Sequence, residues 1–215
     1  MILHDLAVTH VVTPPLFVRH PCRAGIWSVD SVGSIVEHNG RVAKEQIPQD
    51  GEYPYVPASV ELRAIDRRGA RSILSRRPPD GEDWAEDYPT AGDLEAAKLL
   101  LERLQAGEAP GPFGMYEIRE AATGMVIGGI GFHHAPHIDG SVEVGYGIVP
   151  DKWDRGFGTE ALEEAVELAQ RSGARKVTAR TLPTNVASRR VLEKAGFGLA
   201  EIREGYALYE IDLGL

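Results

Sequence analysis

The pattern of apolar and polar positions divides the chain near residue 57 into an N-terminal part and a main body, residues 58–215. Residues 1–57 contain β-rich runs separated by prolines, and Asn39-Gly40 lies between two of these runs, 26–36 and 41–47. Asn-Gly between β-rich runs is a strong short-range signal for a β-hairpin. Because an isolated hairpin is only marginally stable in water, the pattern predicts an N-terminal extension that packs on the main body or on a partner subunit.

The main body begins with the pattern of a short strand and two helices. Residues 60–65 predict a strand, and Asp66 is placed to cap a helix that runs to about Leu74. Thr90, with Asp93 three residues later, is close to a capping box and precedes an apolar stripe at helical spacing. The stripe consists of Leu94, Ala97, Leu101 and Leu104.

Strands predominate after the second helix. Three β-rich runs, 113–119, 125–132 and 141–149, are joined by short turns. Because short turns cannot join parallel strands, these runs predict an antiparallel meander. A helix over 159–171, a strand over 176–181, a helix over 187–194 and two strands within 198–213 complete the pattern. The sequence predicts an α/β fold with a mixed, mostly antiparallel central sheet flanked by helices.

The loop before helix 159–171 has the composition of an anion site. Gly156 and Gly158 let the backbone approach a ligand. The start of a helix offers about four N–H groups without intrahelical partners, together with partial positive charge, and Arg155 adds a full positive charge. These features favour a pyrophosphate site. A βα turn with glycines for close packing is the alternative.

Two other phosphate-binding motifs are excluded. A Walker loop needs a lysine after its last glycine, but Gly158 is followed by Thr159-Glu160. A dinucleotide fingerprint needs a third glycine and a parallel βαβ unit, whereas residue Ala161 stands at the third position and a meander precedes the loop.

Composition narrows the class of protein further. The net charge of −9 argues against nucleic acid as a partner, because a phosphate-binding surface needs a dominant basic patch. No apolar run approaches the ~20 residues of a membrane span, and residues 1–10 lack the basic start of a signal peptide. The single cysteine, Cys22, excludes a multi-cysteine zinc site and a disulfide framework within the chain. We therefore expect a cytoplasmic protein without a membrane or nucleic-acid partner.

Three blocks in the main body resemble motifs of the GCN5-related N-acetyltransferase (GNAT) superfamily. Trp153-x-x-Gly156-x-Gly158 is similar to the family's Gln/Arg-x-x-Gly-x-Gly/Ala signature, with Trp in place of Gln or Arg. Asn185-x-x-Ser188, followed by Gly196-Phe197, and the strand Glu143-Val-Gly-Tyr146 are similar to blocks of the branch that includes the ribosomal-protein acetyltransferases. The blocks stand in the family's order and cover about residues 60–213, whereas the N-terminal extension lies outside the resemblance.

The resemblance implies how the chain would hold acetyl-CoA as its co-substrate. The sheet is expected to splay after the strand that ends at Val149, with pantetheine in the gap along the backbone of Ile148 and Val149. The pyrophosphate is expected on the N–H groups from Arg155 to Thr159. The residues implied in acetyl-CoA binding are Ile148, Val149, Trp153, Asp154, Arg155, Gly156, Phe157, Gly158, Thr159 and Asn185.

Glu143 is the candidate base. Acetyl transfer to an amine needs a neutral nucleophile, a polarised thioester carbonyl and a proton for the departing thiolate. Strand alternation places Glu143 opposite Val142 and Val144, and the resemblance implies a base because a glutamate on this strand has that role in several relatives. Glu143 could act through water or hold the substrate's ammonium group. A solvent-facing strand glutamate is the alternative.

Ser188 is the candidate acid for the thiolate. Many family members have a tyrosine four residues later, but Leu192 occupies that position here. The resemblance implies that Ser188 takes this role, as a serine is thought to do in the most similar branch. The alternative is that Asn185 caps the helix and Ser188 merely lies in its first turn.

Histidines cluster beside the second turn of the meander, at positions 133, 134 and 137. Adjacent strand residues point to opposite faces, so His133 and His134 cannot easily share a metal ion, and we expect no metal site. One of these two could face the acceptor groove and assist proton transfer. A satisfied or solvated histidine is the alternative.

An acidic loop with one aromatic side chain precedes the second helix. It contains Asp83, Trp84, Glu86 and Asp87, in the region that shapes the acceptor site in relatives. We expect this loop to receive a cationic amine, and an ordinary solvated loop is the alternative.

The resemblance implies an acetyl-CoA-dependent N-acetyltransferase. The acetyl group would pass to a primary amine, on a protein N-terminus or a small molecule, by direct attack in a ternary complex. No cysteine falls in the matched region, which disfavours an acyl-cysteine route. A non-catalytic acyl-CoA sensor or subunit is the alternative, motivated by the tyrosine missing at Leu192. A homodimer formed through the N-terminal hairpin is left open.

Overall fold

The computed structural model describes residues 17–18, 27–29, 35–37 and 59–214. The chain divides into two units, residues 1–56 and 57–215, and each is described by itself. The first unit contains three short strands in the order β1-β2-β3, with antiparallel pairing throughout. These strands are β1 (Phe17–Val18), β2 (Trp27–Val29) and β3 (Ile35–Glu37).

The run 26–36 contains β2 and the first two residues of β3, where the sequence pattern predicts one strand. Trp27 pairs with Glu37 and Val29 with Ile35. The segment between them includes Asp30 and Gly33, residue types that favour turns. The predicted Asn39-Gly40 turn lies outside the described residues, and the packing of the extension on the body or on a partner stays a prediction.

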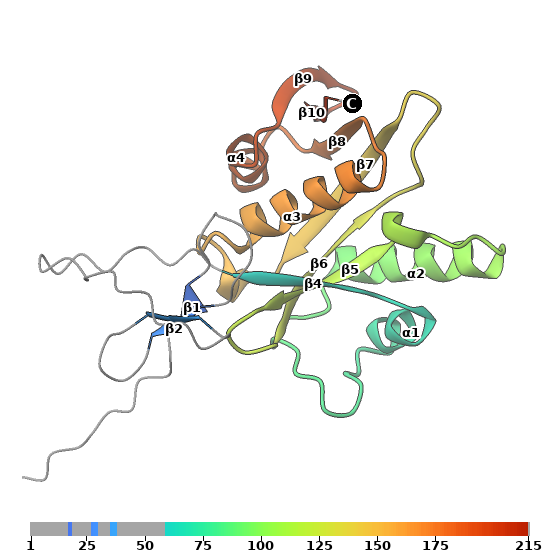
Figure 1. Cartoon of the computed structure of the whole chain (residues 1–215). Helices are drawn as coiled ribbons and strands as arrows, with labels where there is room; N and C mark the ends of the chain where they lie inside the picture. Colours follow the sequence, from blue (N-terminus) through green and yellow to red (C-terminus); the bar gives the residue numbers. More distant parts are fainter. Residues whose placement is uncertain (1–16, 19–26, 30–34, 38–58, 215) are drawn as a thin grey trace, which may run out of the picture. The chain divides into compact units, whose positions relative to one another are not determined.

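The second unit is built on a seven-stranded sheet, in the order β4-β5-β6-β7-β8-β10-β9 (Figure 1). Its strands are β4 (Val60–Ala64), β5 (Met115–Glu120), β6 (Val126–Phe132), β7 (Ser141–Ile148), β8 (Lys176–Thr181), β9 (Gly198–Arg203) and β10 (Tyr206–Asp212). Every neighbouring pair is antiparallel except β7 and β8, which are parallel. The structure therefore confirms the predicted mixed, mostly antiparallel sheet.

Four α-helices accompany the sheet in the described second unit, with two 3₁₀ turns. They are α1 (Arg67–Ser75), α2 (Ala91–Gln105), α3 (Phe157–Arg171) and α4 (Val186–Lys194), and the turns are η1 (Gly111–Phe113) and η2 (Pro150–Lys152). Asp66 caps α1, and Thr90 with Asp93 forms the capping box of α2, as predicted. α3 begins two residues earlier than the predicted helix 159–171, because Gly156 adopts φ 91° and serves as its N-cap.

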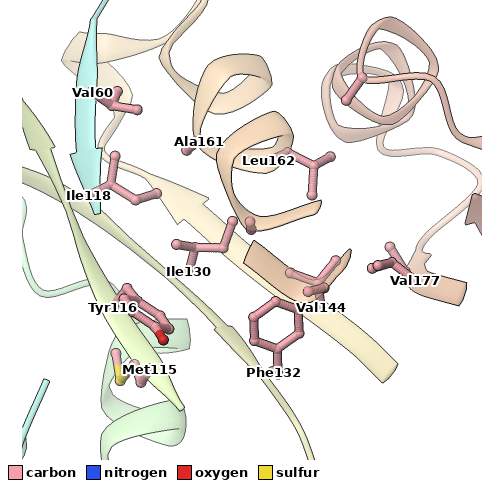
Figure 2. Close-up of a cluster of buried hydrophobic side chains, with 14 of the residues drawn as sticks. Val60, Met115, Tyr116, Ile118, Ile130, Phe132, Val144, Ala161, Leu162 and Val177 are labelled. Carbon is pink, nitrogen blue, oxygen red and sulfur yellow. The ribbon is translucent and has the colours of Figure 1, made fainter. Parts of the chain in front are cut away.

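The hydrophobic core between the sheet and α3 is continuous. Ile130 of β6 and Val144 of β7 belong to the same buried cluster as Ala161 of α3 (Figure 2). Gly129, the neighbour of Ile130, faces the other side of the sheet, since a Cβ there would meet Asp93 of α2. α2 and the α1 helix packed on it therefore cover the face opposite α3.

The sheet opens between β7 and β8. Residues 141–143 of β7 pair with residues 176–178 of β8, and the pairing ends there. Beyond that point β7 continues beside β6, while β8 continues beside β10. This divergence is the predicted splay next to the strand that ends at Val149, and it begins after Glu143.

Candidate active site

A cavity of about 860 Å³ lies where the sheet opens. Its wall includes residues from α2 on one face of the sheet, from β6, β7 and β8 at the opening, and from Ser188 and Leu192 of α4. The cavity therefore reaches both faces of the sheet through the gap between β7 and β8. Such a passage can bring two ligands together from opposite sides.

Four glycines form the part of the cavity floor that faces α2. Gly129 and Gly131 of β6 pair directly with Gly147 and Gly145 of β7, and all four line the cavity. Side chains at these positions would project from the sheet into the space below α2. Because glycine has no side chain, this space stays open and forms part of the cavity. We refer to these four residues as the glycine floor.

The edge of β7 that borders the gap offers backbone hydrogen-bonding groups. Glu143 O accepts from His133 N at 3.0 Å, and Val149 N donates to Ile127 O at 2.9 Å, so the odd-numbered residues of β7 are bonded toward β6. By alternation, the amides of Tyr146 and Ile148 point toward the gap. This geometry suits the extended pairing predicted for pantetheine.

The two residues predicted to pair with pantetheine differ in what they can offer. Ile148 faces the gap, and its carbonyl accepts from the Trp153 indole Nε1 at 2.6 Å. Val149 uses its N–H on Ile127 and its carbonyl on Lys152 N at 3.0 Å. The backbone of Val149 is thus committed within the protein, and of these two residues it is Ile148 whose N–H is directed at the gap.

The predicted phosphate loop forms the N-terminus of α3. The N–H groups of Thr159 and Glu160 both donate to Gly156 O at 3.1 Å, which leaves those of Phe157 and Gly158 as the first-turn donors without intrahelical acceptors. Asp154 and Gly156 have φ of 56° and 91°. Within the predicted span from Arg155 to Thr159, the N–H of Thr159 is thus bonded within the protein, and the remaining N–H groups stay the predicted pyrophosphate donors.

Arg155 supplies positive charge beside this helix start. Its side chain is about half exposed, and its Nη2 lies 3.7 Å from Glu120 Oε1. Lys152 Nζ forms a closer contact of 3.0 Å with Glu120 Oε2. The guanidinium also lies 5.2 Å from the centre of the Phe157 ring. Arg155 is loosely held and remains accessible to an anion.

Glu143 is engaged by two basic side chains. Its Oε1 lies 3.2 Å from His133 Nδ1 and accepts a hydrogen bond from Arg180 Nε at 2.8 Å. The pKa of Glu143 is lowered to about 2, chiefly by the hydrogen bond from His133, with burial opposing and Arg180 adding to the decrease. His133 and Arg180 line the cavity, whereas Glu143 is not among the lining residues. A carboxylate with this pKa is a weak base at neutral pH, so its role as base stays a prediction.

Ser188 and Tyr146 meet on the α4 side of the opening. The two hydroxyl oxygens lie 3.1 Å apart, and Tyr146 also donates to Ser188 O at 3.3 Å. Burial raises the pKa of Tyr146, and the hydrogen bond with Ser188 partly offsets this effect. Tyr146 is therefore protonated at neutral pH. The sequence pattern identifies Tyr146 only as a strand residue, because no local pattern links two residues that lie so far apart in the chain.

Asn185 caps α4 through its side chain. Its Oδ1 accepts from Ser188 N at 3.1 Å, so the helix-cap alternative for this residue is confirmed. The remaining amide group of Asn185 is exposed, and a contact with pantetheine stays a prediction. Leu192, at the position of the missing tyrosine, is buried and lines the cavity.

The histidine cluster separates in the way that strand alternation predicts. His133 lines the cavity, with its Nε2 directed at the glycine floor near Gly145. His134 and His137 stack on each other with ring centres 3.9 Å apart, away from the cavity. Within the described residues, no group of three or more His, Cys, Asp or Glu side chains is placed to hold a metal ion.

The acidic loop before α2 does not contribute to the cavity wall. Asp83, Trp84, Glu86 and Asp87 are all absent from the lining residues. Trp84 instead bridges to Val126 and packs edge-on against Tyr88, with ring centres 4.9 Å apart. The expectation that this loop receives an amine is therefore not supported. The first turns of α2 occupy the corresponding wall.

In the described part of the chain, no helix is both long and apolar enough to cross a membrane.

Comparison with known proteins gives a consistent family assignment. Residues 60–198 match the family model described as Acetyltransferase (GNAT) domain. The uncharacterised N-acetyltransferase YoaA of Bacillus subtilis (strain 168) is 35% identical over 81 residues, which are 37% of this chain and 46% of YoaA. The match thus spans about half the length of that relative.

Solved structures show the same fold at low identity. RimJ of Mycobacterium smegmatis, in complex with CoA-disulfide, is 19% identical with a TM-score of 0.50, over 71% of this chain and 81% of RimJ. A dodecameric spermidine N-acetyltransferase of Vibrio cholerae is 17% identical with a TM-score of 0.51, over 72% and 94%. The splayed sheet, the helix start at Gly156 and the family model agree, and the chain belongs to the GNAT acetyltransferase family.

Proposed function

We propose that this protein is an acetyl-CoA-dependent N-acetyltransferase that acts on a primary amine by direct attack in a ternary complex. The observation that carries the proposal is the cavity at the sheet opening, which is reached from both faces. One face carries the groups suited to acetyl-CoA, and the other carries the glycine floor, where an acceptor can lie. The acceptor class is a protein N-terminus or a small-molecule amine, and the similar Vibrio cholerae enzyme is a spermidine N-acetyltransferase, which acts on a small-molecule amine.

The described residues fit acetyl-CoA at two places. The gap-facing amides of Tyr146 and Ile148 can pair with an extended amide chain such as pantetheine. The N–H groups of Phe157 and Gly158, with Arg155 beside them, suit a pyrophosphate. Bound acetyl-CoA supplies the activated acetyl thioester. The protein's own residues position it, exclude water and move protons.

Proton transfer would use residues on both sides of the opening. On the α2 side, Glu143 accepts from His133 Nδ1 in the arrangement that leaves Nε2 free to take a proton. On the α4 side, the Ser188 hydroxyl would protonate the thiolate as the carbon–sulfur bond breaks, and Tyr146 would return a proton to Ser188. The Tyr146–Ser188 pair would thus replace the acid that Leu192 cannot provide.

Thiol release tests the proposal. The full chain with acetyl-CoA should release CoA thiol when supplied with an amine from a panel of alanine-initiated peptides, diamines and amino alcohols. Binding of CoA without turnover of any amine would favour the alternative of a non-catalytic acyl-CoA sensor.

Gly156→Val tests the phosphate loop directly. Because Gly156 has φ 91°, a β-branched side chain there would force the helix start out of position. We expect a loss of CoA affinity of tenfold or more, about 1.4 kcal/mol, measured by calorimetry. Gly173→Val is the matched control, since Gly173 has φ 88° at the other end of α3 with open space around it. Unchanged CoA affinity in the Gly156 variant would contradict the assignment.

A further inference from the structure

Asp93 is a buried carboxylate in the wall of the cavity. It is the third residue of α2, it is only 3% exposed, and it lies above the glycine floor. One carboxylate oxygen, Oδ2, accepts from Thr90 N at 2.8 Å and from the Thr90 hydroxyl at 2.7 Å. The capping box therefore fixes the side chain through Oδ2, and it provides no hydrogen-bond donor for the other oxygen, Oδ1.

Oδ1 of Asp93 lies against Gly129 in the floor. A Cβ at Gly129 would come within 2.2 Å of this oxygen, so the close approach depends on glycine. Among the described residues, none donates a hydrogen bond to Oδ1. Asp93 as a whole is buried while it lines the cavity, and a buried carboxylate with one oxygen that receives no hydrogen bond is unusual, because desolvation of a charge is costly unless a partner compensates it.

The basic side chains of the cavity do not neutralise Asp93. Arg180 pairs with Glu143 at 2.8 Å, and Arg103 pairs with Glu108 at 2.9 Å. In the part of the chain that the structure describes, no cationic side chain forms an ion pair with Asp93. Burial raises the pKa of Asp93, and the two hydrogen bonds from Thr90 only partly oppose this effect. The residues of the site therefore leave the charged form of Asp93 uncompensated, and a bound cation would stabilise it.

We propose that Asp93 binds the primary amine of the acceptor, which donates a hydrogen bond as an ammonium group to Oδ1 above the glycine floor. This inference rests on the proposed function, because it assumes that the cavity receives an acceptor amine. The carboxylate then selects cationic groups and places the nitrogen beside the open edge of β7. Deprotonation of the nitrogen precedes its attack, and the nearby His133 Nε2 also faces the floor.

Asp93→Asn tests this binding role in the full chain. The variant keeps a side-chain oxygen for Thr90 N but removes the charge. We expect kcat/KM for 1,4-diaminobutane and for an alanine-initiated tetrapeptide to fall about ten- to a hundred-fold, in line with a charge-assisted hydrogen bond, mainly through KM. CoA affinity should be unchanged. Asp66→Asn, the same substitution at the exposed cap of α1, is the matched control and should leave kcat/KM within twofold.

Carbon-13 spectroscopy of the wild-type protein provides a second readout that does not depend on turnover. With the aspartate carboxyl carbons labelled and CoA present, the Asp93 signal should shift on titration with 1,4-diaminobutane and not with 1,4-butanediol. The inference is overturned if the chemical shift of Asp93 does not change with any amine, or if the Asp93→Asn variant has an unchanged kcat/KM. If the signal responds while no amine is acetylated, the amine site stands and the proposed function fails. If turnover occurs without dependence on Asp93, the function stands and the site fails.

Discussion

At the scale of single residues, two carboxylates of the site have opposite environments. Glu143 is held by His133 and Arg180, and its pKa is lowered to about 2. Asp93 has no basic partner among the described residues, and burial raises its pKa. Carboxylates whose environments separate their pKa values commonly have separate tasks. Here Glu143 is suited to orient His133, and Asp93 is suited to meet a cation from outside.

The lowered pKa of Glu143 predicts a specific pH dependence of stability. A carboxyl group with a folded-state pKa below its ordinary value of 4.5 stabilises the fold above that pH, and this contribution is lost as the pH falls toward 2. Glu143→Gln should therefore lower the free energy of unfolding by about 1–3 kcal/mol at pH 7, and the difference from wild type should shrink below pH 4.5. Urea titrations between pH 3.5 and 7 measure it.

Glu167→Gln is the control for this experiment. Glu167 forms an exposed pair with Arg171 at 3.0 Å, and removal of such a pair should change stability by less than about 0.5 kcal/mol. A Glu143→Gln effect that is the same at every pH would show that the loss comes from packing and not from the charge.

At the scale of elements, local patterns predicted most helices and strands, because the caps and the apolar periodicity of an element lie within its own segment of the chain. The capping box at Thr90 marks a helix start that the structure confirms, whereas α3 begins two residues before the predicted start because Gly156 serves as its N-cap. The proposed role of Asp93 in binding an amine cannot be predicted from the sequence, since a capping aspartate has the same sequence pattern whether or not its second carboxylate oxygen faces a cavity. The Tyr146–Ser188 contact joins residues 42 positions apart, and no local pattern encodes it.

The capping box of α2 leads to a prediction about stability. The Thr90 hydroxyl donates to Asp93 Oδ2 at 2.7 Å and accepts from Asp93 N at 3.4 Å. Thr90→Ala removes both interactions and should lower the free energy of unfolding by about 1 kcal/mol, measured by urea denaturation. Thr90→Ser keeps the hydroxyl and should retain most of that stability. An equal loss in both variants would mean that the threonine methyl group, rather than the cap, matters.

At the scale of the whole second unit, the sheet consists of two groups of strands that are joined by only three residue pairs. The first group consists of β4 to β7, and the second consists of β8 to β10. The two groups pair only between residues 141–143 and 176–178. A ligand in the gap would pair with the free edge of β7 and connect the two groups of strands. The glycine floor and α4 would then form opposite walls of one site.

Amide hydrogen exchange can test whether CoA occupies this edge. The N–H groups of Tyr146 and Ile148 point toward the gap, while those of Gly145 and Gly147 point toward β6 by strand alternation. CoA binding should slow exchange at Tyr146 and Ile148 by at least about tenfold, because a hydrogen-bonded amide must open before it exchanges. Gly145 and Gly147 serve as internal controls, since their partners on β6 are present with or without ligand. Uniform slowing of all four amides would indicate general stabilisation of the sheet, and the alternating pattern is expected only if the ligand pairs along β7 itself.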